Sequence, residues 1–204
     1  VARFQSKLSY LGFKIEEGTL KTMESIAFSG ELKELSKERI WLETNKALLE
    51  KNPSDYFEVL NECNVLKELC SGDFQTFKKI KEALNILINT NLKPEIIWSV
   101  FVTYSEKLNQ INNAFNPPKK FQASADIFLK IIMLLSKNEI EPKNIFDLLM
   151  VCDALRRPER VINMLPAIDI LTKHYGYSLI NWEELIIQTC KVTPDEEFLK
   201  SSGP

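Results

Sequence analysis

Apolar side chains recur at three- and four-residue steps along most of this 204-residue chain, which is the spacing of one face of an α-helix. Residues 16–28 show the pattern well, because Leu20, Met23, Ile26 and Ala27 follow these steps. Glycine is scarce at 6 residues, and 45% of the residues are hydrophobic. This composition is typical of a helical protein with a real core, so we predict an all-α fold, an irregular array of roughly nine to eleven helices.

Capping residues and chain breaks divide the sequence into the expected helices. Ser36 is a good N-cap, and Pro94 suits a first helical turn, where its missing N–H costs nothing. Gly12 and Gly176 stand where helices should end. Residues 127–135 are apolar nearly all round, which favours a central buried helix. The expected helices are 1–11, 16–28, 37–51, 55–70, 73–89, 94–115, 122–138, 144–155, 160–174 and 182–190.

The first of these helices is expected to pack through an apolar face. The chain begins at Val1 with neither a start Met nor an N-cap, so we expect that it is cut inside a helix and that an upstream part is missing. After Gly12, an extended segment should return to the core. The residues expected on the apolar face and in the returning segment are Ala2, Phe4, Leu8 and Leu11, then Phe13 and Ile15.

Charge gives a mild argument against RNA as a partner. The formal net charge is −2 and the pI is about 5.7, whereas a nucleic-acid binder is usually basic on its binding face. A local basic face is still compatible with these values. No signal peptide and no apolar run long enough to span a bilayer is seen, so cytoplasm is the default expectation.

Residues that bind metals or act as nucleophiles are few. Cys63, Cys70, Cys152 and Cys190 form no Cys-x-x-Cys pair, and His174 is the single histidine. These spacings cannot assemble a zinc site, so we expect small buried thiols and no metal ligands. There is no glycine-rich phosphate loop and no nucleophile–base set, which disfavours an independent enzyme. We expect no catalytic residue on this chain.

Three segments carry a family resemblance. Residues 2–15 combine Ala-Arg-Phe with a later Leu-Gly-Phe-x-Ile, and residues 36–48 read Ser-x-Glu-Arg-Ile-x-x-Glu-x-x-Lys-x-Leu. Residues 153–160 read Asp-Ala-Leu-Arg-Arg-Pro-Glu-Arg. Together they resemble the neck and body of the class II tRNA nucleotidyltransferases, the family of CCA-adding enzymes and bacterial poly(A) polymerases.

The resemblance implies a neck, body and tail fragment without its catalytic head. In the family the head lies upstream, and an acidic pair with two arginines there selects the nucleotide. The parent would transfer CMP and AMP from CTP and ATP to the tRNA 3′ end with Mg²⁺. The missing catalytic head is therefore one expected partner, and the tRNA acceptor and T arms are the other; neither DNA nor a membrane is expected.

Two groups of candidate site residues follow. Arg156, Arg157 and Arg160 form the only arginine cluster and stand near a helix start, which suits RNA phosphates. The alternative for them is a surface network with Asp153 and Glu159. In the neck, the family's arginine braces the region beneath the active site. The residues expected in this bracing are Arg3, Glu38, Arg39 and Glu43, and the alternative for Arg39 is a solvated side chain.

Residues 1–70 are expected to be a neck-like RNA-binding region, 71–143 a weakly matched helical body, and 144–204 a body and tail region truncated at its C-terminus. In many relatives the middle is a His-Asp phosphohydrolase domain. Here Ser105 and Glu106 stand roughly where that pair would lie, so we predict no phosphohydrolase activity. Residues 193–204 resemble the start of the family's closing element.

Two other interpretations stay open. The first is the C-terminal region of a bacterial poly(A) polymerase, which shares the neck pattern. The second is a helical protein-interaction scaffold without an RNA role. The acidic pI supports the scaffold, and so does the absence of interleaved aromatic and basic residues. We favour the CCA enzyme, because residues 153–161 fit it better and no long basic tail is seen.

Overall fold

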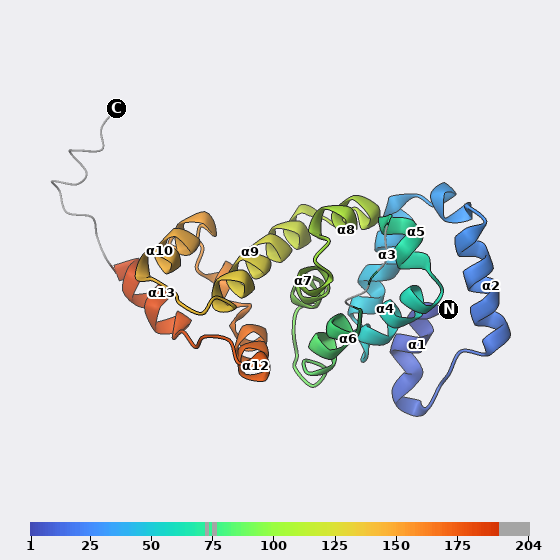
Figure 1. Ribbon diagram of the computed structural model, residues 1–204, viewed down its shortest axis with the longest axis horizontal. Coiled ribbons are helices and arrows are strands. Elements are labelled where there is room, and N and C mark those ends of the chain that lie inside the picture. The colour runs from blue at the N-terminus through green and yellow to red at the C-terminus, as the bar shows by residue number, and fades with distance from the viewer. Residues whose placement is uncertain (72–73, 75–76, 192–204) are drawn as a thin grey trace. The chain divides into compact units, whose positions relative to one another are not determined.

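The computed structural model describes residues 1–71, 74 and 77–191, and this part of the chain is α-helical with no strand (Figure 1). The all-α prediction is confirmed. The described residues form thirteen α-helices and two short 3₁₀ helices. They belong to two compact units, residues 1–132 and residues 133–204, which we call unit 1 and unit 2.

Unit 1 contains most of the helices. Its elements are α1 (Ala2–Leu8), η1 (Ser9–Leu11), α2 (Glu17–Phe28), η2 (Glu31–Glu34), α3 (Lys37–Leu48), α4 (Pro53–Glu62), α5 (Val65–Cys70), α6 (Phe77–Asn85), α7 (Pro94–Ser105), α8 (Leu108–Phe115) and most of α9 (Lys119–Leu135). Unit 2 contains the end of α9, then α10 (Pro142–Val151), α11 (Glu159–Ile162), α12 (Leu165–Tyr175) and α13 (Trp182–Lys191). None of the described helices has the length and apolar character needed to traverse a bilayer.

The core of unit 1 is built around α7, which Figure 1 shows end-on between α6 and α8. Trp98 and Phe101 of this helix are fully buried. Phe57 of α4 stacks on Phe101 with ring centroids 3.8 Å apart, and Phe115 of α8 meets Trp98 edge to face at 5.5 Å. These aromatic contacts hold α4, α7 and α8 together. The sequence predicts a central buried helix at 127–135, and most of its side chains are buried, although Met133 is exposed.

The predicted packing of α1 is wrong in its details. Gly12 takes the expected left-handed conformation with φ of 82° and ends the element. Ala2 and Ser6, however, are the buried residues of α1, which packs against α4 through this small-residue face. Leu11 is 68% exposed, Phe4 is 49% exposed, and Phe13 is exposed instead of returning to the core. The small side chains of Ala2 and Ser6 let α1 approach α4 closely, and the larger side chains of α1 therefore face solvent.

Three predicted helices are each interrupted. The expected helix 55–70 divides into α4 and α5 at Asn64, and the expected helix 94–115 divides into α7 and α8 at Glu106. Both residues adopt φ of 58°, in the left-handed region that ends a helix. The expected helix 160–174 divides into α11 and α12, with Pro166 in the first turn of α12 and Gly176 ending it. The helix count is higher than expected for this reason.

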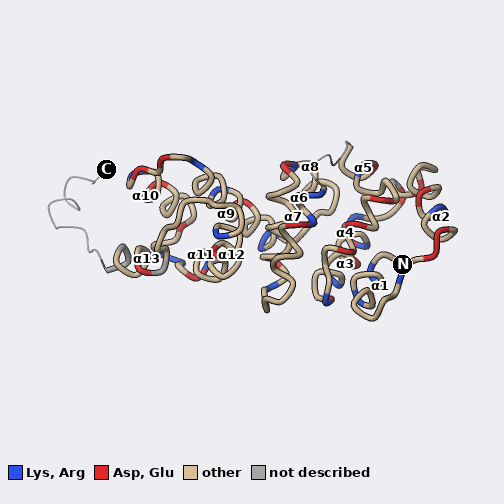
Figure 2. Tube along the Cα trace, turned by 60° about the horizontal axis from the view of Figure 1, so that its bottom comes forward, with Lys and Arg blue, Asp and Glu red and all other residues tan. Residues whose placement is uncertain are grey.

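Unit 2 has its own small core. The buried side chains include Ala154, Val161, Ile168, Leu171 and Trp182. Ser178, after α12, donates its backbone N–H to the carbonyl of Leu135 at the end of α9, with N and O 3.1 Å apart. This hydrogen bond fixes the turn that leads into α13. Acidic and basic residues are interspersed along the described chain rather than segregated (Figure 2).

Candidate nucleic-acid interface

The predicted RNA-binding arginines lie on the turn between α10 and α11 and on α11 itself. After α10, Asp153 takes a left-handed conformation with φ of 55°. The backbone N–H groups of Asp153 and Ala154 close the helix on Met150 and Leu149. The N–H of Arg157 then bonds to the carbonyl of Asp153, with N and O 2.9 Å apart. This tight turn brings the arginines, which are close in sequence, around one carboxylate.

All three arginines face Asp153. Arg156 donates from Nε to both carboxylate oxygens, at 3.2 and 3.3 Å, and from Nη2 to Oδ2 at 2.9 Å. Nitrogens of Arg157 and Arg160 each lie 3.8 Å from Asp153 Oδ2. Arg156 is the most exposed, with 73% of its side chain accessible. The structure therefore shows the surface network with Asp153, whereas Glu159 makes no ion pair within the described residues.

This network leaves positive charge facing solvent. One carboxylate can neutralise only one of three guanidinium groups, and segment 153–160 holds three basic side chains against two acidic ones. Asp153 occupies the Nε and Nη2 edge of Arg156, so the Nη1 side stays available to another acceptor. The surface network and phosphate binding are compatible, because the carboxylate orients guanidinium groups whose outer edges point to solvent.

The same contacts favour the ionised form of the Asp153 carboxyl group. The hydrogen bond from Arg156 is the main cause that holds the pKa of Asp153 below its ordinary value, and the positive charges of all three arginines add to it. The pKa of Arg156 is raised in return by Asp153. The carboxylate is thus ionised at neutral pH, and the cluster keeps its geometry there.

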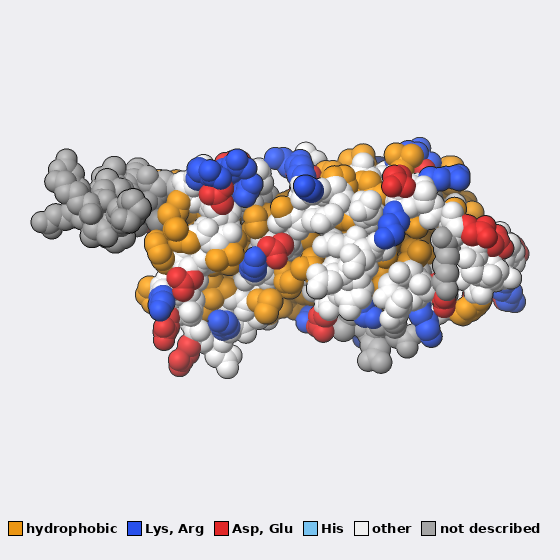
Figure 3. Space-filling view, turned by 90° about the horizontal axis from the view of Figure 1, so that it is seen from above, with side chains coloured by type: hydrophobic (Ala, Val, Ile, Leu, Met, Phe, Trp, Pro, Cys, Tyr) orange, Lys and Arg blue, Asp and Glu red, His pale blue; other side chains and the backbone are white. Residues whose placement is uncertain are grey.

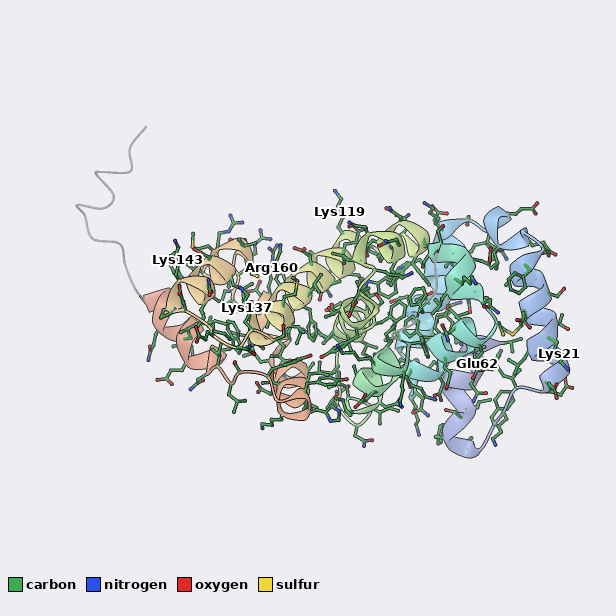
Figure 4. The ribbon with its side chains drawn as sticks, viewed as in Figure 1. Lys21, Glu62, Lys119, Lys137, Lys143 and Arg160 are labelled. Atoms are coloured by element: carbon green, nitrogen blue, oxygen red, sulfur yellow. The ribbon has the colours of Figure 1, made fainter. Side chains whose placement is uncertain are left out.

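Other cations belong to the same unit. Lys137 and Lys143 are exposed, and neither forms an ion pair within the described part of the chain. Figure 4 labels both together with Arg160, and Figure 3 shows a small group of basic side chains at one edge of unit 2, with acidic side chains beside it. The basic group of unit 2 is therefore small and centred on the three arginines.

In the neck, the structure brings Arg3 and Glu43 together. Arg3 Nε lies 3.2 Å from Glu43 Oε2, and Arg3 Nη1 lies 3.2 Å from Glu50 Oε1. Lys46 also binds Glu43, at 2.8 Å, and this hydrogen bond is the main cause that lowers the pKa of Glu43. Arg3 thereby ties α1 to α3. Sequence reasoning missed Glu50, which lies just after the end of α3 at Leu48.

Glu38 and Arg39 are placed differently. Both are exposed, and neither forms an ion pair among the residues that the structure describes. The carboxylate of Glu43, one turn from Arg39, is already engaged by Arg3 and Lys46. Arg39 instead lies at an apolar pocket of about 310 Å³, whose other lining residues include Met23, Ile26, Leu32, Leu35 and Ile40. A bracing role for Glu38 and Arg39 stays a prediction.

The thiols are buried as expected where they are described. Cys63, Cys70 and Cys152 lie in the core. Burial raises the pKa of Cys70 to about 12 and is the main cause that raises the pKa of Cys63, so neither is activated as a thiolate. No group of three or more His, Cys, Asp or Glu in the described ranges could hold a metal ion. His174 lies in the last turn of α12, and its ring meets that of Tyr175 edge to face.

The family comparison covers the neck first. Residues 12–72 match the family model described as "Probable RNA and SrmB-binding site of polymerase A". No solved structure matches the chain.

The side chain of Cys190 and the predicted closing element at 193–204 lie outside the described residues.

Known relatives extend the match over most of the chain. It is 30% identical to a CCA-adding enzyme of Pseudomonas putida (strain W619) over 193 residues, covering 86% of the chain and 48% of that protein. It is 32% identical to a CCA-adding enzyme of Alteromonas mediterranea, covering 89% of the chain and 43% of that protein. A Multifunctional CCA protein of Haemophilus influenzae is 54% identical over 71 residues, covering 35% of the chain and 17% of that protein. The chain spans about half the length of the first two relatives.

Proposed function

Because the chain belongs to the family of CCA-adding enzymes and poly(A) polymerases, we propose that it is the C-terminal, tRNA-holding part of a CCA tRNA nucleotidyltransferase. In this proposal the whole enzyme adds CMP and AMP, taken from CTP and ATP, to the tRNA 3′ end with Mg²⁺. A catalytic head carries out the transfer, and this chain holds the acceptor and T arms. We assign no step of the transfer to a residue of this chain.

The main support for the proposal is the arrangement of residues 156–160, which we call the arginine segment. Arg156, Arg157 and Arg160 are oriented by Asp153 and keep exposed surface. Double-stranded RNA is recognised mainly by its shape and by contacts with phosphate and 2′-hydroxyl groups, because its deep groove is too narrow for side chains. Guanidinium groups suit phosphate oxygens because their N–H donors are fixed in a planar fork. Such contacts position the tRNA without reading its sequence.

A competition experiment tests which part of the tRNA is held. Labelled tRNA is bound to the chain and displaced by either of two unlabelled RNAs, a hairpin of the acceptor and T arms or an anticodon stem-loop. We expect the first to compete about as well as whole tRNA and the second to compete poorly. Equal competition by both would contradict recognition of the acceptor and T arms.

Poly(A) polymerase is the alternative within the family. The matched model carries its name, and the neck pattern is shared. We favour the CCA enzyme because segment 153–161 fits that group better and because the Pseudomonas and Alteromonas relatives are both CCA-adding enzymes.

A protein partner is the second candidate, and one observation supports it. The apolar pocket beside Arg39 is lined mainly by residues from 23 to 69, inside the segment whose family description names SrmB as well as RNA. An apolar pocket of this kind suits hydrophobic side chains of another protein. The two candidates differ in salt dependence, because phosphate contacts weaken as salt rises whereas apolar burial does not.

A further inference from the structure

Unit 1 contains a pocket besides the one at Arg39. Its lining residues lie far from the arginine segment in the sequence. The pocket has a volume of about 560 Å³ and is lined by residues of η1, the α3–α4 corner and the α6–α7 connection. Figure 1 shows α1, α4 and α6 in this part of unit 1, and α4 contacts both of the other helices. Ligand pockets are commonly about 300–1,000 Å³, so this one is large enough for a nucleotide.

One wall of the pocket is an aromatic ring with a cation over it. Tyr10 is 52% exposed, and Lys51 Nζ lies 3.7 Å from the centroid of its ring. Lys51 is exposed and forms no ion pair within the described residues. Glu50 also lines the pocket, but its carboxylate is paired with Arg3, so it does not neutralise Lys51 directly. The unneutralised charge at this wall is therefore positive.

Hydrogen bonds fix this wall in place. The side chain of Asn52 donates to Ser9 Oγ at 2.6 Å, and its backbone N–H donates to the carbonyl of Ser6 at 3.0 Å. These bonds pin the α3–α4 corner to the end of α1 and to η1. Tyr10 follows Ser9, and Lys51 precedes Asn52, so both side chains project from backbone that these hydrogen bonds hold in place.

The other lining residues complement Tyr10 and Lys51. Leu48, Leu84 and Leu87 are buried and contribute apolar lining. Asn89 and Asn91 are exposed on the α6–α7 connection and line the same pocket. A carboxamide has both donors and an acceptor, which are the groups that pair with the edge of a nucleobase.

We propose that this pocket binds an unpaired nucleotide of RNA, whose base stacks on the ring of Tyr10 in place of Lys51, and whose phosphate is held by Lys51 once it has left the ring. An aromatic face favours any base, because every base has a π-face, and a nearby cation favours the backbone. The inference deepens the proposed function, since it rests on RNA binding by this chain. It assigns a single-stranded site to unit 1, in addition to the phosphate contacts proposed for unit 2.

Two RNA probes and two sets of variants separate the sites. The probes are a short single-stranded oligoadenylate and a blunt-ended RNA duplex, each measured by fluorescence anisotropy. We expect Tyr10→Ala to weaken oligoadenylate binding about tenfold, the scale of one missing stacked base, and to leave duplex binding unchanged. Tyr10→Phe keeps the ring and should bind oligoadenylate like the native chain. Lys51→Gln should weaken oligoadenylate binding and reduce its salt dependence.

The reciprocal variant identifies which proposal fails. Arg156→Ala with Arg157→Ala should weaken duplex binding and leave oligoadenylate binding unchanged. If the native chain does not bind oligoadenylate, or if Tyr10→Ala binds it as tightly, the single-stranded site is refuted whatever the duplex result. If oligoadenylate binds as described but the duplex does not, the duplex-holding role of unit 2 fails and the inference stands. Because Tyr10 is half exposed, its replacement should leave the unfolding temperature nearly unchanged, which excludes misfolding as the cause.

Discussion

At the scale of single residues, Asp153 decides the geometry of the proposed phosphate contacts. Its carboxylate accepts from Arg156 and lies 3.8 Å from nitrogens of Arg157 and Arg160. Three guanidinium groups left to themselves would repel one another, so a shared carboxylate holds them in one place. Segment 153–160 keeps a net positive charge, because its three arginines outnumber Asp153 and Glu159.

The first prediction concerns the titration of Asp153. Its pKa is held below the ordinary value of 3.8, mainly by the hydrogen bond from Arg156. We expect a carboxyl-carbon NMR titration to give a midpoint below that value in the native chain, and a higher midpoint in Arg156→Ala. An Arg157→Ala variant is the control and should give a smaller rise, because Arg157 lies farther from the carboxylate. A midpoint that Arg156→Ala leaves unmoved would show that the pair does not form in solution.

The sign of the stability effect follows from the lowered pKa. A carboxyl group whose pKa is lower in the folded chain stabilises the fold at pH values above its unfolded pKa. This contribution disappears as the pH falls through the lowered folded pKa of Asp153. The pair is exposed to solvent, so its contribution to stability is small.

The site illustrates what single-residue patterns can reveal. The arginine segment 156–160 is contiguous, so a sequence scan finds it directly. Glu50 is harder to find, because its partner Arg3 lies 47 residues away. Tyr10 and Lys51 are also brought together only by the fold, and neither stands in a motif of its own. Side chains that meet across such separations are specified by tertiary packing rather than by local spacing.

At the scale of elements, the aromatic contact between α4 and α7 supports the centre of unit 1. Phe57 and Phe101 are fully buried and stacked nearly parallel, with 10° between their planes. We expect Phe57→Ala to lower the free energy of unfolding by about 3–5 kcal/mol, because it removes buried apolar surface and leaves a cavity. Phe28→Ala is the matched control, because Phe28 is 59% exposed and should cost far less. Equal decreases in denaturant unfolding of the two variants would contradict this core.

Helix boundaries show which local signals are reliable. Gly12 and Gly176 end elements with positive φ, and Ser36 caps α3 by accepting from the N–H of Arg39, all as the sequence predicts. The breaks at Asn64 and Glu106 were not predicted. Glutamate rarely adopts a left-handed conformation, so that break is imposed by packing. Packing also explains why the large side chains of α1 are exposed, because α1 contacts α4 through its small residues.

At the scale of the whole molecule, each of the two compact units carries one of the proposed RNA contacts. Unit 2 contributes the arginine segment 156–160, which suits a duplex. Unit 1 contributes the pocket at Tyr10 and Lys51, which suits a single strand. The division into neck, body and tail at 1–70, 71–143 and 144–204 rests on family resemblance and stays a prediction beside these units. The matches to relatives run through the weakly recognised middle as well.

The central claim is that this chain holds tRNA through phosphate contacts from the arginine segment. Its most direct test is a filter-binding titration of tRNA at several salt concentrations, with the native chain and with Arg156→Ala/Arg157→Ala. We predict that the native affinity falls as salt rises, and that the variant binds more weakly with a slope flatter by roughly 0.7–0.9 for each phosphate that is no longer neutralised. Arg156→Lys/Arg157→Lys keeps the charge and should largely keep the slope. Native binding that is absent or insensitive to salt, or a variant with unchanged affinity and slope, would contradict the claim.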